Sequence, residues 1–359
     1  MAEAKDIVAI SIPFVSGVAA AAVTPWGGES LYWGAAASCG ASVFLLALLC
    51  RSGRRRAVAP LLYFSLGVMC RCSAMIACPV SALSDRDFAA AALHKLTRLL
   101  EDIPFPHSST AALLKAVLTG QRGGLSAQTV GVFRKSGASH ILALSGLHLG
   151  VIYALLSRIL GLLGNSRTAG AARSALCVVA CGFYAIMTGA SPSIVRAFLF
   201  ILLREISRHS PGRRRDPVRI LCTALLLQLA SDPMVLDSVG FQLSYLAMTG
   251  IFLLYPPLKE WYPQQGGKLD VMRRIWNSAA LTLSCQLFTA PVVWVHFHTF
   301  PVHFLLTNLI ALPVSELLII SGVTCITLHA LGIQFAPVDT ATDAIARCLE
   351  FCLGVIAGM

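Results

Sequence analysis

The stretch GASHILALSGLHLGVIYALL, residues 137–156, decides how this chain folds, because small and polar residues interrupt a run otherwise apolar enough for a membrane. Gly146 and Gly150 form a GxxxG spacing, which lets a second helix approach closely. The polar side chains of the stretch would each need a hydrogen-bond partner inside hydrocarbon. They are Ser139, His140, Ser145 and His148. The stretch therefore predicts one helix that faces other helices rather than lipid.

The composition of the whole chain indicates a membrane environment. Of its 359 residues, 56% are hydrophobic and only 13% are charged, far from the average of soluble globular proteins. An apolar helix of roughly 17 to 25 residues crosses the hydrocarbon layer, and the chain offers about eleven candidate segments, of which two are short enough to be re-entrant or tilted. They lie at 7–23, 31–50, 58–78, 139–163, 173–187, 194–206, 218–230, 239–255, 275–295, 302–331 and 341–357. We predict an all-α polytopic membrane protein with about ten to eleven transmembrane or re-entrant helices.

These segments divide the chain into three predicted parts. Residues 1–80 form an N-terminal three-helix membrane segment, residues 81–137 an external amphipathic interfacial segment, and residues 138–359 the channel core. The middle part is too polar to span a membrane, and it predicts short amphipathic helices at 88–100, 110–118 and 126–133. This part either packs on the membrane face of the helix bundle or forms an external collar that attracts polyanions.

Clusters of Arg and Lys predict the orientation, because such residues are in excess in cytoplasmic loops. The connections at 25–30 and 231–238 carry carboxylates but no Lys or Arg, so we place them outside. An even number of predicted spans separates each basic loop from the next, so one topology puts all of them inside with a cytoplasmic N-terminus. These loops lie at 51–56, 167–173, 208–219 and 259–274.

Cysteine and histidine residues give no clear metal or disulfide signal. Most of the twelve cysteines lie singly in apolar segments, where Cys acts as a small hydrophobe. Cys70, Cys72 and Cys78 lie at the predicted outer end of the third segment, and the sequence leaves open whether two of them form a disulfide. In HFHTFPVH, residues 296–303, the aromatic residues favour an interfacial belt over a metal site. With neither an HxHxDH run nor a GxxxxGK(S/T) loop, we expect no metal, no cofactor and no enzymatic activity.

Ionisable residues at membrane depth remain as candidates for function, because they are costly in hydrocarbon. Ser191 and Pro192 predict the N-cap and first residue of a helix, which places Arg196 about one turn inside its positive end. An anion there would meet both the helix dipole and the guanidinium. Alternatively, Arg196 pairs with Glu316 or extends outward to the membrane surface.

Prolines mark two further helices. Pro291 and Pro313 are expected to kink or interrupt their segments and so to expose carbonyls that need a cavity or a partner.

Four patches, in this order, resemble the ComEC family of DNA-uptake membrane proteins: FRKSGASHILALSGLHLG, MTGASPSIVRAFLF, DSVGFQLSYLAMTGI and FTAPVVWVHFHTFPVHFLLTNLIALPVSE. The resemblance covers about residues 111–320. It implies a channel that passes single-stranded DNA across the bacterial cytoplasmic membrane during natural transformation. The residues that we expect along the DNA path are Ser145, His148, Arg196, Gln242, Ser244, Asn308 and Glu316. The residues that we expect in helix packing are Gly146, Gly150 and Gly240.

The resemblance also implies partners. Larger members of the family add an OB-like domain and a metallo-β-lactamase-like domain, whereas this chain resembles only their membrane core. We therefore expect another protein to carry out any strand degradation. We expect a separate cytoplasmic ATPase to act as the motor, and external DNA-binding competence proteins to deliver the strand. The alternatives are a small-molecule transporter or a structural membrane subunit derived from the same fold. Strand polarity, sequence preference and oligomeric state are left open.

Overall fold

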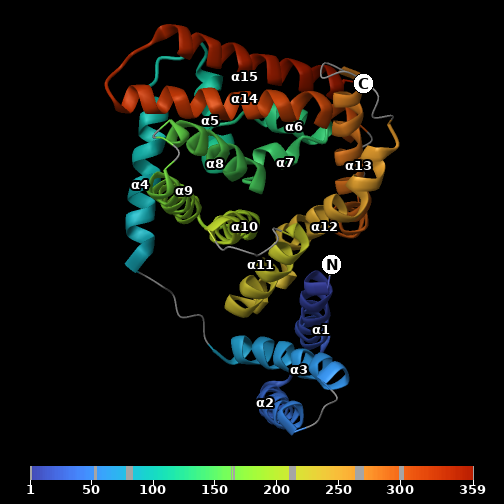
Figure 1. Ribbon diagram of the computed structural model, residues 1–359. Helices are drawn as coiled ribbons and strands as arrows, with labels where there is room; N and C mark the ends of the chain where they lie inside the picture. Colours follow the sequence, from blue (N-terminus) through green and yellow to red (C-terminus); the bar gives the residue numbers. More distant parts are fainter. Residues whose placement is uncertain are drawn as a thin grey trace. The chain divides into compact units, whose positions relative to one another are not determined.

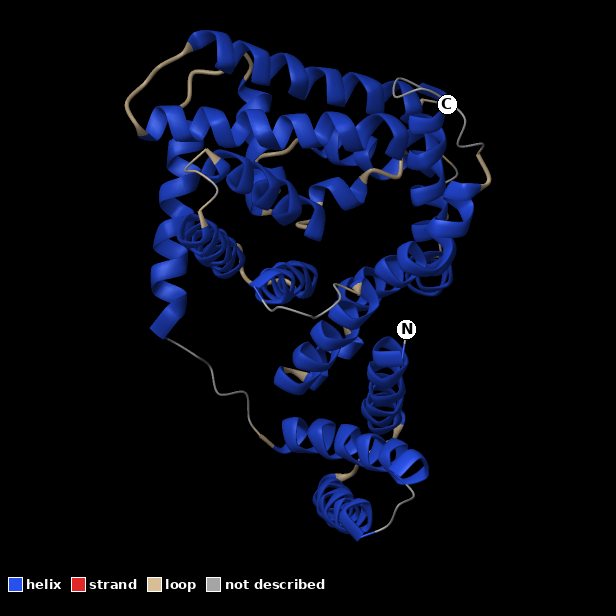
Figure 2. Ribbon diagram, viewed as in Figure 1, coloured by secondary structure: helices blue, strands red, loops and turns tan. Residues whose placement is uncertain are grey.

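The described chain consists of helices joined by loops. A computed structural model describes residues 2–51, 55–77, 84–162, 164, 166–209, 216–262, 271–298 and 303–358. Within these residues there are fifteen α-helices, one short 3-10 helix and no strand (Figure 2). Seven of the described helices are long and apolar enough to cross a membrane, and two shorter helices are also apolar. The prediction of an all-α polytopic membrane protein is confirmed.

The chain forms two compact units, Met1–Ala82 with Leu199–Phe252, and Leu83–Phe198 with Leu253–Met359. The first unit contains α1 (Ala2–Val23), α2 (Gly28–Arg51), α3 (Arg55–Ile76), α11 (Pro217–Ser231) and η1 (Pro233–Asp237). The second contains α4 (Ser84–Glu101), α5 (Ser108–Thr119), α6 (Ala127–Lys135), α7 (Ser139–Leu142), α8 (Gly146–Gly161), α9 (Arg167–Met187), α13 (Val271–Phe297), α14 (Phe304–Ala330) and α15 (Ala336–Ala357). Helices α10 (Pro192–His209) and α12 (Val239–Glu260) contribute residues to both units. The three-part organisation with boundaries at 80 and 137 stays a prediction.

In the first unit, α1 and α3 cross at two glycines. A Cβ atom at Gly17 would overlap the carbonyl oxygen of Phe64, and one at Gly67 would overlap the carbonyl oxygen of Phe14. The two backbones can touch only because both positions lack a side chain. Helix α2 is joined to α3 by buried hydroxyls, since Ser65 Oγ donates to the Ser38 carbonyl at 2.8 Å.

The core of the second unit is built around α5. Helices α14 and α15 lie side by side, with α5 and α6 against them (Figure 1). Leu113, Leu114 and Val117 of α5 have no exposed surface, and Gly322 of α14 lies where a Cβ would come within 2.6 Å of Leu114. The helix predicted at 110–118 is therefore present and packs against the helix bundle, while its place at the membrane interface stays a prediction. Its apolar residues are buried by helices that are distant in the sequence.

A buried carboxylate from α15 holds the start of α5. Asp343 is 4% exposed, and its Oδ1 accepts hydrogen bonds from the Thr110 hydroxyl at 2.6 Å and the His107 backbone N–H at 3.2 Å. The His107 side chain does not cap α5 itself, and its Nδ1 lies 2.8 Å from Asp343 Oδ2. Asp343 thus supplies from another helix the cap that the local sequence lacks.

Several predicted details differ from the structure. Helices α13 and α14 continue through Pro291 and Pro313, so neither proline interrupts its helix, while the other expectation, a kink, stays a prediction. The helices predicted at 194–206 and 341–357 form as α10 and α15, but neither is among the candidate spans, because each carries several charged residues. Cys70 and Cys72 are free thiols, and Cys78 lies outside the described residues.

Candidate functional site

The helix predicted over 137–156 is broken in two, which corrects the prediction of one continuous helix. Helix α7 ends at Leu142, Ala143 has an extended backbone, and α8 begins at Gly146. Ser145 is the N-cap of α8, and its Oγ accepts a hydrogen bond from the Leu147 N–H at 3.3 Å. A serine followed three residues later by a side chain that reaches back forms a capping box, and this start signal competes with helix continuation.

His148 is the reciprocal member of that capping box. Its Nδ1 accepts a hydrogen bond from the Ser145 backbone N–H at 3.1 Å and lies 3.0 Å from Ser145 Oγ. A backbone N–H can only donate, so Nδ1 carries no proton and the neutral imidazole carries its hydrogen on Nε2. The residue is 1% exposed, and its Nε2 is buried without a hydrogen bond of ordinary geometry among the described residues.

Arg196 lies against the first residue of α8. A Cβ at Gly146 would come within 2.6 Å of Arg196 Nη2 and 3.1 Å of Ala197 Cβ, so the missing side chain makes room for the guanidinium. Arg196 is 8% exposed. A buried cation beside a helix N-terminus places two positive fields together, an arrangement that favours an anion between them.

The start of α10 matches its prediction in part. The helix begins at Pro192, and the Ser191 carbonyl accepts from the Ile194 and Val195 N–H groups at 2.9 Å. The Ser191 Oγ, however, is buried without a hydrogen-bond partner among the described residues. Ser191 thus occupies the N-cap position through its backbone, while its hydroxyl is left with unused hydrogen-bonding capacity.

Other side chains hold the broken stretch in place, and the sequence did not single them out. Arg122 Nε donates to the Leu142 carbonyl at 3.2 Å, which satisfies one of the carbonyls at the end of α7. The Tyr184 hydroxyl donates to the Leu118 carbonyl at 2.7 Å and so ties α9 to the end of α5. A signal for Tyr184 exists in hindsight, because a buried tyrosine normally needs a partner for its hydroxyl.

The third patch lies in the first unit, where it forms a different cluster. Gln242 Nε2 donates to the Leu236 carbonyl at 2.9 Å, which ties α12 to η1. Arg71, 4% exposed, binds the Pro233 carbonyl at 2.8 Å and Asp237 Oδ2 at 2.6 Å. An arginine inside an apolar segment was the available signal for Arg71.

Ser244 and Gly240 belong to the same patch on α12. Ser244 is half-buried, and Gly240 is exposed in the first turn of the helix. The expected roles of both residues stay predictions.

The fourth patch places its two polar residues on α14. Asn308 Oδ1 is buried without a hydrogen bond among the described residues, next to Thr307, whose hydroxyl donates to the Ser136 carbonyl at 2.6 Å. Glu316 is exposed, and within the described residues no ion pair joins it to Arg196. The alternative in which Glu316 neutralises Arg196 is therefore not what the structure shows.

The structure thus brings together one group of the predicted residues, Ser145, Gly146, His148 and Arg196. Gly150 does not belong to it, because a Cβ there would meet nothing within 4 Å, and its expected role in helix packing stays a prediction. Among the residues that the structure describes, no group of three or more His, Cys, Asp or Glu could hold a metal ion.

Apolar helices with a buried, cation-bearing polar site define a multi-pass α-helical membrane protein. The chain belongs to the Competence protein family, whose profile matches residues 117–358. All four patches fall inside that range, so the resemblance seen in the sequence is confirmed.

Individual relatives cover the same region. The chain is 28% identical over 217 residues to ComE operon protein 3 of Bacillus subtilis, covering 60% of this chain and 26% of that protein. It is 26% identical over 222 residues to Recombination protein 2 of Haemophilus influenzae, and the matched region covers 59% of this chain and 28% of that protein. It is 28% identical over 240 residues to an uncharacterized protein of Aquifex aeolicus, and the matched region covers 66% of this chain and 52% of that protein. The chain therefore spans about a quarter to a half of these relatives. No solved structure matches it significantly.

Proposed function

We propose that this chain is the membrane part of a channel that passes single-stranded DNA across the bacterial cytoplasmic membrane during natural transformation. Membership of the Competence protein family supports a role in DNA uptake. The names ComE operon protein 3 and Recombination protein 2 belong to two relatives and point the same way. Transport by a protein of this kind needs no chemistry on the DNA, so we propose no enzymatic activity.

One observation carries the proposal, the contact between Gly146 and the buried Arg196. A phosphate that passes the start of α8 would meet the guanidinium and the helix dipole together, and both interactions are stronger away from water. A phosphodiester that passes there would gain a charge-assisted hydrogen bond from the guanidinium. Base identity should matter little, because the phosphate backbone is common to all sequences.

The energetics require a partner that does work. Moving one phosphate charge inward against 100 mV costs about 2.3 kcal/mol, so a long strand cannot enter unaided. We propose a separate cytoplasmic ATPase as the motor and external DNA-binding competence proteins as the donors of the strand. Arg273 and Arg274, in the first turn of α13, are candidates for motor docking, together with Arg213–Arg215, which lie outside the described residues.

The test is Arg196→Ala, expressed in the native host from which the chromosomal copy has been deleted. We expect uptake of labelled DNA into a nuclease-protected state to fall by about tenfold or more, the value of one lost charge-assisted contact. The amount of folded protein in the membrane should fall much less. Arg204→Ala is the matched control, because Arg204 is an exposed arginine of the same helix.

Two outcomes would contradict the proposal. Equal losses of uptake and folded protein would make Arg196 a structural residue. Unchanged DNA uptake after deletion of the chain would remove the transport function altogether and would favour the small-molecule transporter or the structural subunit.

A further inference from the structure

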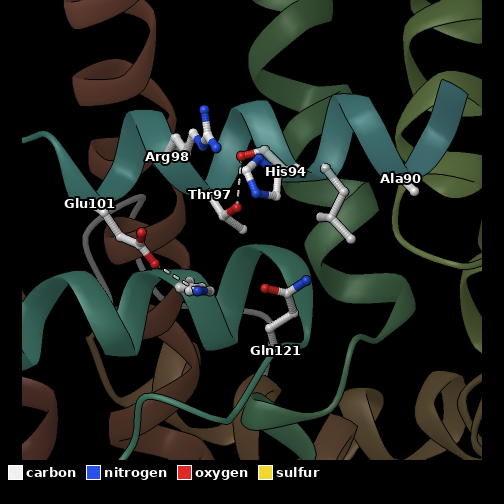
Figure 3. A pocket seen from close by; sticks show the side chains of 8 residues that line it. Ala90, His94, Thr97, Arg98, Glu101 and Gln121 are labelled. Atoms are coloured by element: carbon white, nitrogen blue, oxygen red, sulfur yellow. Dashed lines mark hydrogen bonds and ion pairs between the residues drawn. The ribbon is translucent and has the colours of Figure 1, made fainter. Parts of the chain in front are cut away.

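A groove between α4 and α5 lies apart from the residues that form the site at Arg196. It has a volume of about 420 Å³, and Figure 3 shows it from close by. Both helices belong to the second unit, and neither is among the candidate membrane spans. The polar residues that line it are His94, Thr97, Arg98, Glu101, Lys115 and Gln121.

Glu101 occupies an unusual place in this groove. It is the last residue of α4, where the helix dipole disfavours a negative charge. Its Oε1 nevertheless lies 2.8 Å from Lys115 Nζ, the contact drawn as a dashed line in Figure 3. The glutamate side chain is 57% exposed and the lysine side chain 23%, so the cation is the better fixed of the two.

The surroundings of Glu101 are positive. The hydrogen bond from Lys115 and the charge of Lys115, followed by the charges of His94 and Arg98, hold the pKa of the Glu101 carboxyl below its ordinary value. Figure 3 shows Arg98 directed away from α5, so it adds to the field rather than to the contacts. The groove therefore favours an anion at the place that the carboxylate now takes.

Hydrogen-bond donors around that place are available to a ligand. Lys115 has three donor protons, of which one suffices for Glu101, and the Gln121 side chain makes no hydrogen bond among the described residues. Thr97 is not available as a donor, since its hydroxyl donates to the His94 carbonyl at 2.9 Å. A phosphodiester, like a carboxylate, spreads one negative charge over two oxygens, so it can accept hydrogen bonds from the Lys115 ammonium and from the Gln121 amide together.

We propose that the α4–α5 groove binds a backbone phosphate of single-stranded DNA, and that the Glu101 carboxylate occupies the phosphate position until DNA displaces it. The choice of DNA as the ligand rests on the function proposed above. Glu101 is then a built-in competitor, which keeps Lys115 paired in the absence of DNA and lowers the affinity of the groove for weaker anions.

The experiment measures binding of a fluorescent oligothymidylate to the purified full chain in phosphatidylcholine nanodiscs, by anisotropy over a range of salt concentrations. Lys115→Gln should weaken binding and reduce the slope of log affinity against log salt by about 0.7, the value for one phosphate contact to a single strand. Glu101→Gln should strengthen binding by about twofold to fivefold, because an exposed ion pair no longer competes. In the double variant the gain from Glu101→Gln should vanish, since Lys115 is the group it releases.

Neighbouring residues of the same charge provide the controls. Lys95→Gln removes an exposed lysine of α4 outside the groove, and Asp102→Asn removes the acidic residue next to Glu101. Both should leave affinity and salt slope nearly unchanged. Equal effects of Lys95→Gln and Lys115→Gln, or a gain from Glu101→Gln that persists without Lys115, would overturn the proposal.

Two further outcomes separate the alternatives. An effect of Lys115→Gln that appears only when phosphatidylglycerol is added would assign the groove to a lipid headgroup and would overturn the DNA site. If deletion of the chain abolishes DNA uptake while the groove variants bind the oligonucleotide like the wild type, the groove proposal alone is wrong.

Discussion

Gly146 and Gly150 look equivalent in the sequence, but their surroundings differ. A Cβ at Gly146 would come within 2.6 Å of Arg196 Nη2, whereas one at Gly150 would meet nothing within 4 Å. We expect Gly146→Ala to displace the buried guanidinium and to lower DNA uptake by about tenfold, as loss of the arginine itself would. The measurement is nuclease-protected uptake of labelled DNA, normalised to the folded protein in the membrane.

Gly150→Ala is the control for Gly146→Ala, because it adds the same methyl group to the same helix. It should leave uptake unchanged and stabilise α8 by up to about 1 kcal/mol through helix propensity. If both alanines reduce uptake equally, the contact with Arg196 is not what matters at Gly146.

Single functional residues could be found from the sequence only where their free-energy cost in an apolar segment does not depend on the neighbours. A charge or an imidazole in an apolar segment is expensive wherever it lies, so Arg196 and His148 stood out. The cost of a Cβ at Gly146 depends on a neighbour from α10, and the sequence does not contain that neighbour's position. The capping box between Ser145 and His148 was readable in principle, yet its partner is a histidine rather than the usual Glu or Gln.

At the scale of elements, the crossing of α1 and α3 allows a prediction about the free energy of unfolding. Gly67→Ala would push a Cβ onto the Phe14 carbonyl, and backbone cannot move aside as a side chain can. We expect a loss of about 1–3 kcal/mol in the free energy of unfolding, the usual cost of overpacking. The measurement is the unfolding transition of the purified protein in mixed micelles as the denaturing detergent is increased.

Gly40→Ala serves as the control for this crossing, since Gly40 lies on α2 and a Cβ added there would meet nothing within 4 Å. Its transition should shift little or slightly upward. A Gly67→Ala protein that unfolds like the wild type would show that the two backbones do not touch in the membrane.

Helices were the elements that the sequence predicted best, because apolar runs of membrane length have few alternatives. Each of the eleven apolar segments forms helix, and only the segment at 139–163 is divided between two helices, α7 and α8. The helices that bury α5 could not be predicted, for a physical reason. Its burial comes from α14 and α15, and its N-terminal cap comes from Asp343, more than two hundred residues away. Local patterning cannot reveal a cap that another helix supplies.

At the scale of the whole molecule, the orientation depends on whether α10 crosses the membrane. Its 18 residues would extend about 27 Å at 1.5 Å per residue, just enough for the hydrocarbon layer. Its charges at Arg204, Glu205 and Arg208 gather near one end, where the two exposed arginines can reach the membrane surface and Glu205 is buried with Arg208 within 3.7 Å. Arg196 is the exception, because it lies near the other end of the helix and is buried against the start of α8.

We therefore predict that α10 spans the membrane and that the basic loops share the cytoplasmic side with the N-terminus. An epitope inserted after Gly27, between α1 and α2, should then be accessible from outside intact spheroplasts. One inserted at 265–266, between α12 and α13, should become accessible only after lysis, because the surrounding Lys and Arg residues hold that loop inside. An odd number of crossings between the two insertions places them on opposite sides. If both epitopes are instead found on the same side, the number of crossings is even and this topology is wrong, because α10 or one of the two shorter apolar helices, α8 and α11, does not span the membrane.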